Sequence, residues 1–324
     1  MQPGATLDET TAAIRRLIGN VERVIAGNAP GVEAAAVCLF AGGNLLLEGV
    51  PGVGKTMLAR SLARSIGGTF RRVQATPDLL PSDVTGISVY DQERREFRFV
   101  AGPIFANIVL VDEINRTTPR TQSALLEPME ERQVTVEGVP HALPDPFMLV
   151  ATQNPVEYHG TYPLPEGELD RFAMTVSLYP PSLKDAQEIV HRQLLGHPIE
   201  SLEPVLGADE VVAHQAAVRR VHIDALVIEY AVRLVEATRA HADVALGASQ
   251  RAVLSLTRSA QALAAARGRT YVLPDDVKAL APAALAHRLV VSAQRRAGNP
   301  AAGRVVVDQI LSEVPVPLGL AATA

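Results

Sequence analysis

One eight-residue segment restricts the fold of this chain more than any other feature of its sequence. It consists of Gly49, Val50, Pro51, Gly52, Val53, Gly54, Lys55 and Thr56, between the apolar run NLLLE and the helical pattern TMLARSLARSI. Glycines let backbone N–H groups surround a phosphate, and the helix N-terminus adds a favourable dipole. The segment therefore predicts an ATP site in which Lys55 bridges the β- and γ-phosphates and Thr56 binds Mg²⁺. The alternative is a glycine-rich turn that happens to hold a lysine.

A second polar site is predicted where a buried strand ends. The run IVLVDE places Asp112 and Glu113 directly after four apolar residues. In an open α/β sheet, ligands bind at the carboxyl ends of the strands. We expect Asp112 to hold Mg²⁺ through its water shell and Glu113 to polarise the water that attacks the γ-phosphate. An isolated Asp-Glu pair is more often a solvated strand end, but the phosphate loop upstream favours hydrolysis.

The order of apolar patterns predicts a P-loop α/β fold with a mainly parallel sheet, followed by a helical domain. Strand-like runs cover 44–48, 70–74, 107–113, 147–153 and 173–178. The alternating stretch EFRFV indicates an inserted hairpin at about 88–103. Residues 209–324 show alanine-rich amphipathic patterns and no convincing strand. We expect a nucleotide-binding core over 1–196 and an all-helical domain over 197–324.

The composition argues against several other classes of protein. The single Cys38 excludes an intramolecular disulfide and a multi-cysteine zinc site, which suits a reducing compartment. The N-terminus lacks a signal-peptide pattern, and no apolar run approaches the ~18 residues of a membrane span. The net charge is −6 over residues 1–185 and +1 over 186–324, unlike a strongly basic nucleic-acid binder. We expect a cytoplasmic protein with neither membrane insertion nor a nucleic-acid partner.

Longer strings of the sequence resemble the MoxR family of AAA+ ATPases, in the clade with an insert in helix 2. These strings are GPIFANIVLVDEINR, TQSALLEPMEERQVTVEG, LVATQNPVEYHGTYPLPEGELDRF, LGASQR and YVLPDDVKALAPAALAHRL. They extend over most of the chain, up to about residue 290. The resemblance implies a five-stranded αβα core with a helical lid, assembled as a homo-oligomeric ring, often a hexamer, with ATP between protomers.

The resemblance also implies nucleotide contacts outside the two motifs. Val24 and Ile25 match the apolar wall near the adenine, and Met57 extends the contacts of the loop. Asn154 matches sensor 1, a polar side chain that helps to orient the attacking water. Without the resemblance, Asn154 would be a polar strand end before Pro155.

Two arginines match family positions that act on the γ-phosphate. Arg171 in LDRF matches the arginine finger of a neighbouring subunit, and Arg251 in GASQR matches sensor 2. A guanidinium supplied across an interface is worth ~10³–10⁵ in the rate of phosphoryl transfer. Without the resemblance, Arg171 would be a surface partner of Asp170, and Arg251 would belong to a helix-face salt bridge. The motif leaves open whose nucleotide Arg251 serves.

The chain departs from the family pattern at a few positions outside the catalytic groups. Pro128 stands where alanine is more common, Gln250 where proline is, and Gly167–Glu168 where Ala-Gln is. Pro128 puts the length of the helix after the Asp-Glu pair in question, since proline interrupts helices. Gln250 does the same for the start of the sensor-2 helix, since proline is favoured at a first helical position.

The function expected from these residues is Mg²⁺-dependent ATP hydrolysis that remodels or activates partner proteins. The resemblance implies clients that contain von Willebrand factor A domains, although no residue of the sequence identifies the client. One alternative is an assembly scaffold that is gated by nucleotide binding, for which Glu113, Asn154 and Arg171 would be superfluous. The others are a DNA-associated AAA+ motor and a subunit of a metal chelatase.

Overall fold

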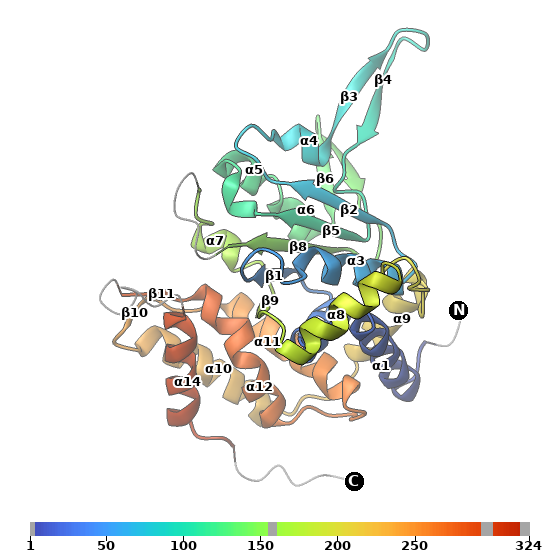
Figure 1. Ribbon diagram of the computed structural model, residues 1–324. Helices are drawn as coiled ribbons and strands as arrows, with labels where there is room; N and C mark the ends of the chain where they lie inside the picture. Colours follow the sequence, from blue (N-terminus) through green and yellow to red (C-terminus); the bar gives the residue numbers. More distant parts are fainter. Residues whose placement is uncertain (1–3, 155–160, 293–300, 318–324) are drawn as a thin grey trace.

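A computed structural model describes residues 4–154, 161–292 and 301–317 (Figure 1). Its centre is a five-stranded parallel sheet with the strand order β2-β5-β8-β1-β9. The five strands are β1 (Leu45–Glu48), β2 (Phe70–Gln74), β5 (Ile108–Asp112), β8 (Met148–Gln153) and β9 (Met174–Ser177). Each coincides with one predicted run, so the predicted α/β class and its parallel sheet are confirmed.

Successive side chains of the inner strands point to opposite faces of this sheet. In β5, Ile108 and Leu110 belong to one buried cluster, and Val109 and Val111 belong to the other. The inner strands β5, β8 and β1 are buried almost throughout. Burial on both faces explains why these strands are continuous apolar runs rather than alternating ones.

Helices cover one face of the sheet, and short helices and one hairpin cover the other. The face of Ile108 and Leu110 packs with α1 (Leu7–Glu22), α2 (Ala29–Phe40) and α3 (Lys55–Ser65). Across the sheet lie α4 (Pro81–Thr85), η1 (Ile114–Arg116), α5 (Pro119–Ser123), α6 (Leu126–Glu131) and α7 (Glu166–Leu169). Pro128 is the third residue of the short α6, so two short helices follow the Asp-Glu pair instead of one long one.

Two antiparallel hairpins lie outside the central sheet. Strands β3 (Gly86–Asp91) and β4 (Glu96–Ala101) form a ribbon that projects from the body, in the region where an insert was predicted (Figure 1). Strands β6 (Gln133–Val136) and β7 (Val139–Ala142) form a hairpin that the apolar pattern did not predict. Its turn residues Glu137 and Gly138 both have positive φ, as a tight two-residue hairpin turn requires.

Beyond β9, the regular elements of the described residues are helices apart from one small ribbon and an isolated bridge between His222 and Tyr271. The helices are α8 (Leu183–Leu195), α9 (Ala208–Val218), α10 (Ala225–Ala240), α11 (Gln250–Ala266), α12 (Pro274–Leu285), η2 (Ala286–Arg288) and α14 (Ala302–Glu313). The ribbon pairs β10 (Val244–Leu246) with β11 (Val290–Val291). The expectation of no strand after residue 209 was therefore wrong, because strands this short show no period-two pattern.

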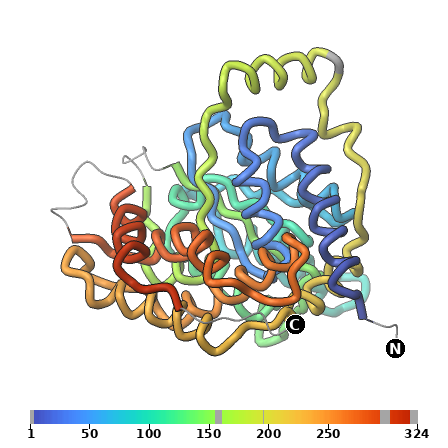
Figure 2. The backbone as a smooth tube through the Cα atoms, turned by 90° about the horizontal axis from the view of Figure 1, so that it is seen from below, coloured from blue at the N-terminus to red at the C-terminus, as the bar shows by residue number. Residues whose placement is uncertain are grey.

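The N-terminal helices and the later helices share one hydrophobic core. Leu17 of α1, Leu45 of β1 and Leu263 of α11 belong to a single buried cluster. Thr11 of α1 donates a hydrogen bond to the Ala265 carbonyl at 2.7 Å. Figure 2 shows these later helices beside the N-terminal ones. The division at residue 196 therefore stays a prediction. None of the described helices is long and apolar enough to span a bilayer.

Candidate functional site

The glycine-rich loop connects β1 to α3, as its position in the sequence predicts. Gly54 is the N-cap of α3 with a φ of 98°, in the left-handed region that favours glycine. A Cβ atom at Gly49 would lie 2.7 Å from the Leu178 carbonyl oxygen, so only glycine fits there. The Nζ atom of Lys55 donates to the carbonyls of Gly49 and Val50, which holds the ammonium over the loop.

Asp112 ends β5 in a nearly closed hydrogen-bonding environment. The residue is 8% exposed, and its Oδ1 atom accepts from the Thr152 hydroxyl at 2.6 Å. Its Oδ2 atom accepts from Nη2 of Arg72 at 2.5 Å and from Nε at 3.1 Å. These donors fix the orientation of the Asp112 carboxylate, whose oxygen atoms are ligands of the kind that bind a hard cation or the water shell around one.

Glu113 follows with a backbone conformation that is uncommon for a residue with a side chain. Its φ is 58° and its ψ is 49°, a conformation that costs of order 1–3 kcal/mol and clusters at functional sites. Its N–H donates to the Thr152 hydroxyl at 2.8 Å, which helps to hold this turn. Its carboxylate accepts from Arg116 at 2.9 Å and from Gln74 at 3.3 Å.

Thr152, Arg72 and Gln74 also belong to this site, although no sequence motif pointed to them. All three lie on strands that neighbour β5, close to the carboxyl ends of those strands. Their positions at the ends of predicted strands were the available signal, since the ends of parallel strands meet at one edge of a sheet.

The other residues predicted at this edge lie on the neighbouring elements. Asn154 directly follows β8 and is 8% exposed. Ile25 is buried, and its Cδ1 atom is 3.7 Å from the position of a Cβ atom on Gly54. Val24 and Met57 are partly buried and pack against the same core cluster. Because β5, β8 and β1 are neighbours, the phosphate loop, Asp112–Glu113 and Asn154 come together at one edge.

Arg171 and Arg251 lie at the opposite end of the strands, near the residue at which β9 begins. Arg171 precedes β9, whereas the phosphate loop follows β1, and these two strands are parallel. Both arginines contact Glu130, Arg171 through Nε at 3.3 Å and Arg251 through Nη2 at 2.7 Å. Asp170, the alternative partner of Arg171, instead pairs with Arg288 at 3.2 Å. The structure therefore brings the two arginines together and separates them from their own phosphate loop.

The start of the helix that carries Arg251 is well defined despite Gln250. Helix α11 begins at Gln250, and Ser249 is its N-cap. The Ser249 hydroxyl accepts from the Arg251 N–H at 3.0 Å and donates to both carboxylate oxygens of Asp170. A serine cap thus defines the helix start where the family more often uses proline.

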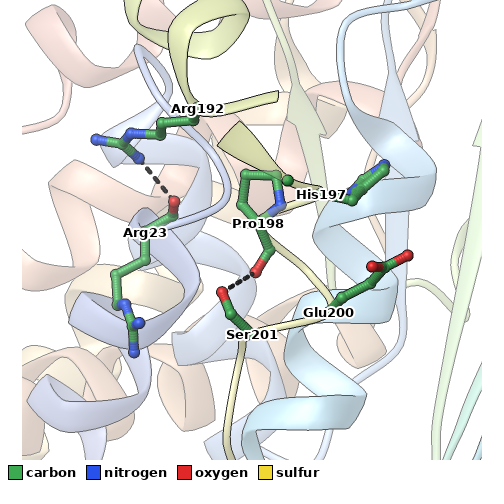
Figure 3. A pocket seen from close by; sticks show the side chains of 7 residues that line it. Arg23, Arg192, His197, Pro198, Glu200 and Ser201 are labelled. Atoms are coloured by element: carbon green, nitrogen blue, oxygen red, sulfur yellow. Dashed lines mark hydrogen bonds between the residues drawn. The ribbon is translucent and has the colours of Figure 1, made fainter. Parts of the chain in front are cut away.

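A surface cavity of about 640 Å³ is lined by none of the predicted site residues (Figure 3). It is lined by Arg23, Arg192, Gly196, His197, Pro198, Glu200 and Ser201. Arg192 donates to the Arg23 carbonyl at 2.6 Å, so this guanidinium is already bound to the backbone. Neither Val24 nor Ile25 lines the cavity, and we assign it no part in nucleotide chemistry.

Comparison with known proteins agrees with this geometry. Residues 44–174 match the ATPase family associated with various cellular activities (AAA), and residues 236–312 match the AAA lid domain. Chaperone MoxR1 of Mycobacterium tuberculosis is 40% identical over 313 residues, which cover 94% of this chain and 82% of that protein. The uncharacterized protein YeaC of Bacillus subtilis is 47% identical over 303 residues, 94% of each chain.

A solved structure has the same fold over nearly its whole length. The crystal structure of a candidate ATPase from Cytophaga hutchinsonii has a TM-score of 0.87 and 36% identity, covering 96% of this chain and 97% of that one. Proteins named MoxR from Methylorubrum extorquens and Paracoccus denitrificans are 29% and 28% identical over 89% and 91% of this chain. Together with the phosphate loop and the Asp-Glu strand end, these relatives show that the chain belongs to the MoxR family of AAA+ ATPases.

Proposed function

We propose that this ATPase hydrolyses ATP with Mg²⁺ and couples the reaction to chaperone-like remodelling or activation of partner proteins. The observation that carries the proposal is the convergence of Lys55, Asp112 and Glu113 at one edge of the sheet. The similarity to Chaperone MoxR1 supports the chaperone-like outcome.

The residues of the edge fit a nucleotide with its metal ion. The loop and the first turn of α3 supply backbone N–H groups that have no partner within the helix, and Lys55 adds an ammonium for the β- and γ-phosphates. The Thr56 hydroxyl and the Asp112 carboxylate are oxygen ligands of the kind that Mg²⁺ prefers. The ion supplies charge neutralisation on the phosphates when bound. Ile25 offers an apolar surface to the base.

Glu113 is proposed as the residue that polarises the attacking water, with Asn154 orienting it. The contacts of Glu113 with Gln74 and Arg116 keep its carboxylate at the sheet edge. A positioned acid–base group contributes about 10²–10⁴-fold to the rate. We therefore expect Glu113→Gln to retain ATP binding and to lose turnover by about this factor.

The position of the two arginines supports a ring in which they serve the neighbouring protomer. Strand β9 has four residues, which extend over about 13 Å at about 3.3 Å per residue. Arg171 precedes this strand and the phosphate loop lies beyond its other end, so the guanidinium is too far from its own γ-phosphate. We propose that Arg171 and Arg251 both act across the interface of a homo-oligomeric ring, of the hexameric kind.

Mixing two inactive variants tests this arrangement. Glu113→Gln protomers lack the water-polarising carboxylate but keep Arg171 and Arg251. Arg171→Ala protomers lack one of these arginines but keep the phosphate loop, Asp112 and Glu113. We expect each variant alone to lose turnover, Arg171→Ala by about 10³–10⁵-fold, and the mixture to recover a measurable fraction. Glu229→Gln, which removes an exposed carboxylate on α10, is the control and should leave turnover unchanged. Wild-type rates in both single variants would refute the mechanism.

The clients are proposed to be proteins with von Willebrand factor A domains. The protein is proposed to act in the cytoplasm, because a single buried cysteine suits a reducing compartment. A Glu113→Gln ring should hold its ATP-bound client complex, so proteins that co-purify with it identify the client. Lys55→Ala, which removes the phosphate contact, is the matched control and should release them. If Glu113→Gln supported full function in cells, binding without hydrolysis would suffice and the scaffold alternative would replace this proposal.

A further inference from the structure

One carboxylate joins two arginines from distant parts of the chain. Glu130 lies near the end of α6, Arg171 follows α7, and Arg251 lies in the first turn of α11. The Oε1 atom of Glu130 is 3.3 Å from Nε of Arg171 and 2.7 Å from Nη2 of Arg251. All three residues line one cavity of about 170 Å³. A single oxygen atom thus holds a guanidinium of the core next to one carried by the lid helix.

The second carboxylate of this region is already committed to other donors. Asp170 pairs with the buried Arg288 at 3.2 Å and accepts from the Ser249 hydroxyl at 2.8 and 2.7 Å. Its distance to Arg251 is 3.8 Å, longer than the contact of Arg251 with Glu130. Glu130 is therefore the carboxylate that the two arginines share.

The charge balance of this cluster suits binding of a further anion. Two guanidinium groups within ion-pair distance of one oxygen atom would repel each other without that oxygen atom. The cavity is lined by four arginines and two carboxylates, so positive charge is left over: Arg132, Arg171, Arg251 and Arg258 against Glu130 and Asp170. The side chain of Glu130 is 33% exposed and that of Arg251 is 52% exposed, so the cluster is open to an approaching phosphate. The arginines are arranged before the phosphate arrives, which lowers the cost of ordering them.

We propose that Glu130 is a positioning residue that presents Arg171 and Arg251 together to the γ-phosphate on the neighbouring protomer. The inference rests on the proposed function, in which these arginines act across the interface. Glu130 itself touches no nucleotide; it acts through the two guanidinium groups. Because it joins the core to the lid helix α11, it also makes the geometry of the finger depend on where the lid lies.

Mixed rings separate this role from a merely structural one. In a mixture of Glu113→Gln and Arg171→Ala protomers, the recovered turnover uses the arginines of the first protomer and the phosphate edge of the second. We expect Glu130→Gln to lower this recovery by about 10- to 100-fold when added to the Glu113→Gln protomer, since a misplacement of about 1 Å can cost 10²-fold. Added to the Arg171→Ala protomer, the same change should have no effect.

Two further variants sharpen the result. Glu131→Gln removes a neighbouring carboxylate of α6 that contacts Gln133 and neither arginine, so it should leave the recovery unchanged on either protomer. Glu130→Asp keeps the charge and should restore part of the loss. In uniform Glu130→Gln rings, kcat should fall while KM for ATP stays the same, because the phosphate loop of each protomer is intact.

The possible failures have different meanings. Equal losses with Glu130→Gln on either protomer would assign Glu130 to folding or assembly and overturn the inference, while the proposed function would stand. Unchanged recovery on both protomers would overturn it as well. The mixture of Glu113→Gln and Arg171→Ala protomers could also recover no turnover although mixed rings formed. The arginines would then not act across the subunit interface, and the inference would fail together with that part of the proposed function.

Discussion

At the scale of single residues, His287 shows how burial converts one side chain into a source of pH dependence. Its Nε2 atom contacts the Phe172 carbonyl at 3.1 Å, as a donor in the neutral ring. Burial, reinforced by the adjacent positive charge of Arg288, lowers the pKa of His287 to about 3. In the unfolded chain the ring has its usual pKa of 6.5 and binds a proton below that pH. The folded state therefore loses stability as the pH falls from 6.5 towards 3.

Replacement of His287 by glutamine should remove this dependence. Each pH unit below 6.5 costs about 1.4 kcal/mol for one group, so wild type should lose about 2 kcal/mol more than the variant between pH 7 and pH 5. Glutamine keeps a donor for the Phe172 carbonyl but does not titrate. Urea unfolding of both proteins at the two pH values measures the difference, and the carboxylates that titrate in both cancel. Equal losses in the two proteins would contradict the assignment.

The proposed catalytic residues could be located from the sequence where a local motif contains them. Lys55 and Asp112 belong to short patterns whose chemistry depends on spacing, and the structure places them at one edge of the sheet. Glu130 was not predictable, because its role comes from contacts with residues far along the chain. The role of Thr152 could not be predicted either, because the residues with which it forms hydrogen bonds, Asp112 and Glu113, lie about 40 positions earlier in the chain.

At the scale of elements, helix α11 depends on its N-cap more than an ordinary helix does. The Ser249 hydroxyl caps the helix and also donates to Asp170. Ser249→Ala should lower the free energy of unfolding by about 2.5–4 kcal/mol, since the loss of a cap costs about 1 kcal/mol and that of a hydrogen bond to a charged group about 1.5–3 kcal/mol. Ser182→Ala at the N-cap of α8 is the control, because the Ser182 hydroxyl also donates to a carboxylate, that of Asp185 at 2.6 Å, but at an exposed site. Water replaces that contact, so the control should cost only about 1 kcal/mol. Equal effects, measured by urea unfolding, would show that the part-buried contact with Asp170 adds no more stability than the exposed contact with Asp185.

Long apolar elements were predictable and short ones were not. Strands β5 and β8 are buried on both faces of the sheet, so most of their residues are apolar and the sequence shows a continuous apolar run. Strands β10 and β11 have three and two residues, too few for any periodicity to appear. The hairpin of β6 and β7 depends on its turn, where Glu137 has a φ of 51°. Glu-Gly is a weaker turn signal than Asn-Gly or Asp-Gly.

At the scale of the whole molecule, the two predicted domains are coupled through one core. Leu17, Leu45 and Leu263 lie in the same buried cluster although they belong to α1, β1 and α11. The Arg15 side chain also donates to the Ala266 carbonyl at 3.1 Å. Sequence patterns predict which face of each helix is apolar, but they do not say which helix will cover it. Which helices pack together depends on the three-dimensional path of the chain. A boundary drawn at residue 196 therefore does not predict whether the two parts unfold together.

A shared core should make the described chain unfold as one unit. Leu263 in α11 is 2% exposed, so Leu263→Ala leaves a cavity in the core and should lower the free energy of unfolding by about 2–5 kcal/mol. We expect hydrogen-exchange protection to fall in β1 and α1 as much as in α12. Leu254→Ala on the same helix, at a 56%-exposed position, should change protection little. Mass spectrometry of exchanged peptides compares the regions directly. A loss confined to the later helices would mean that core and lid unfold separately, because separate cores would leave the protection of β1 untouched.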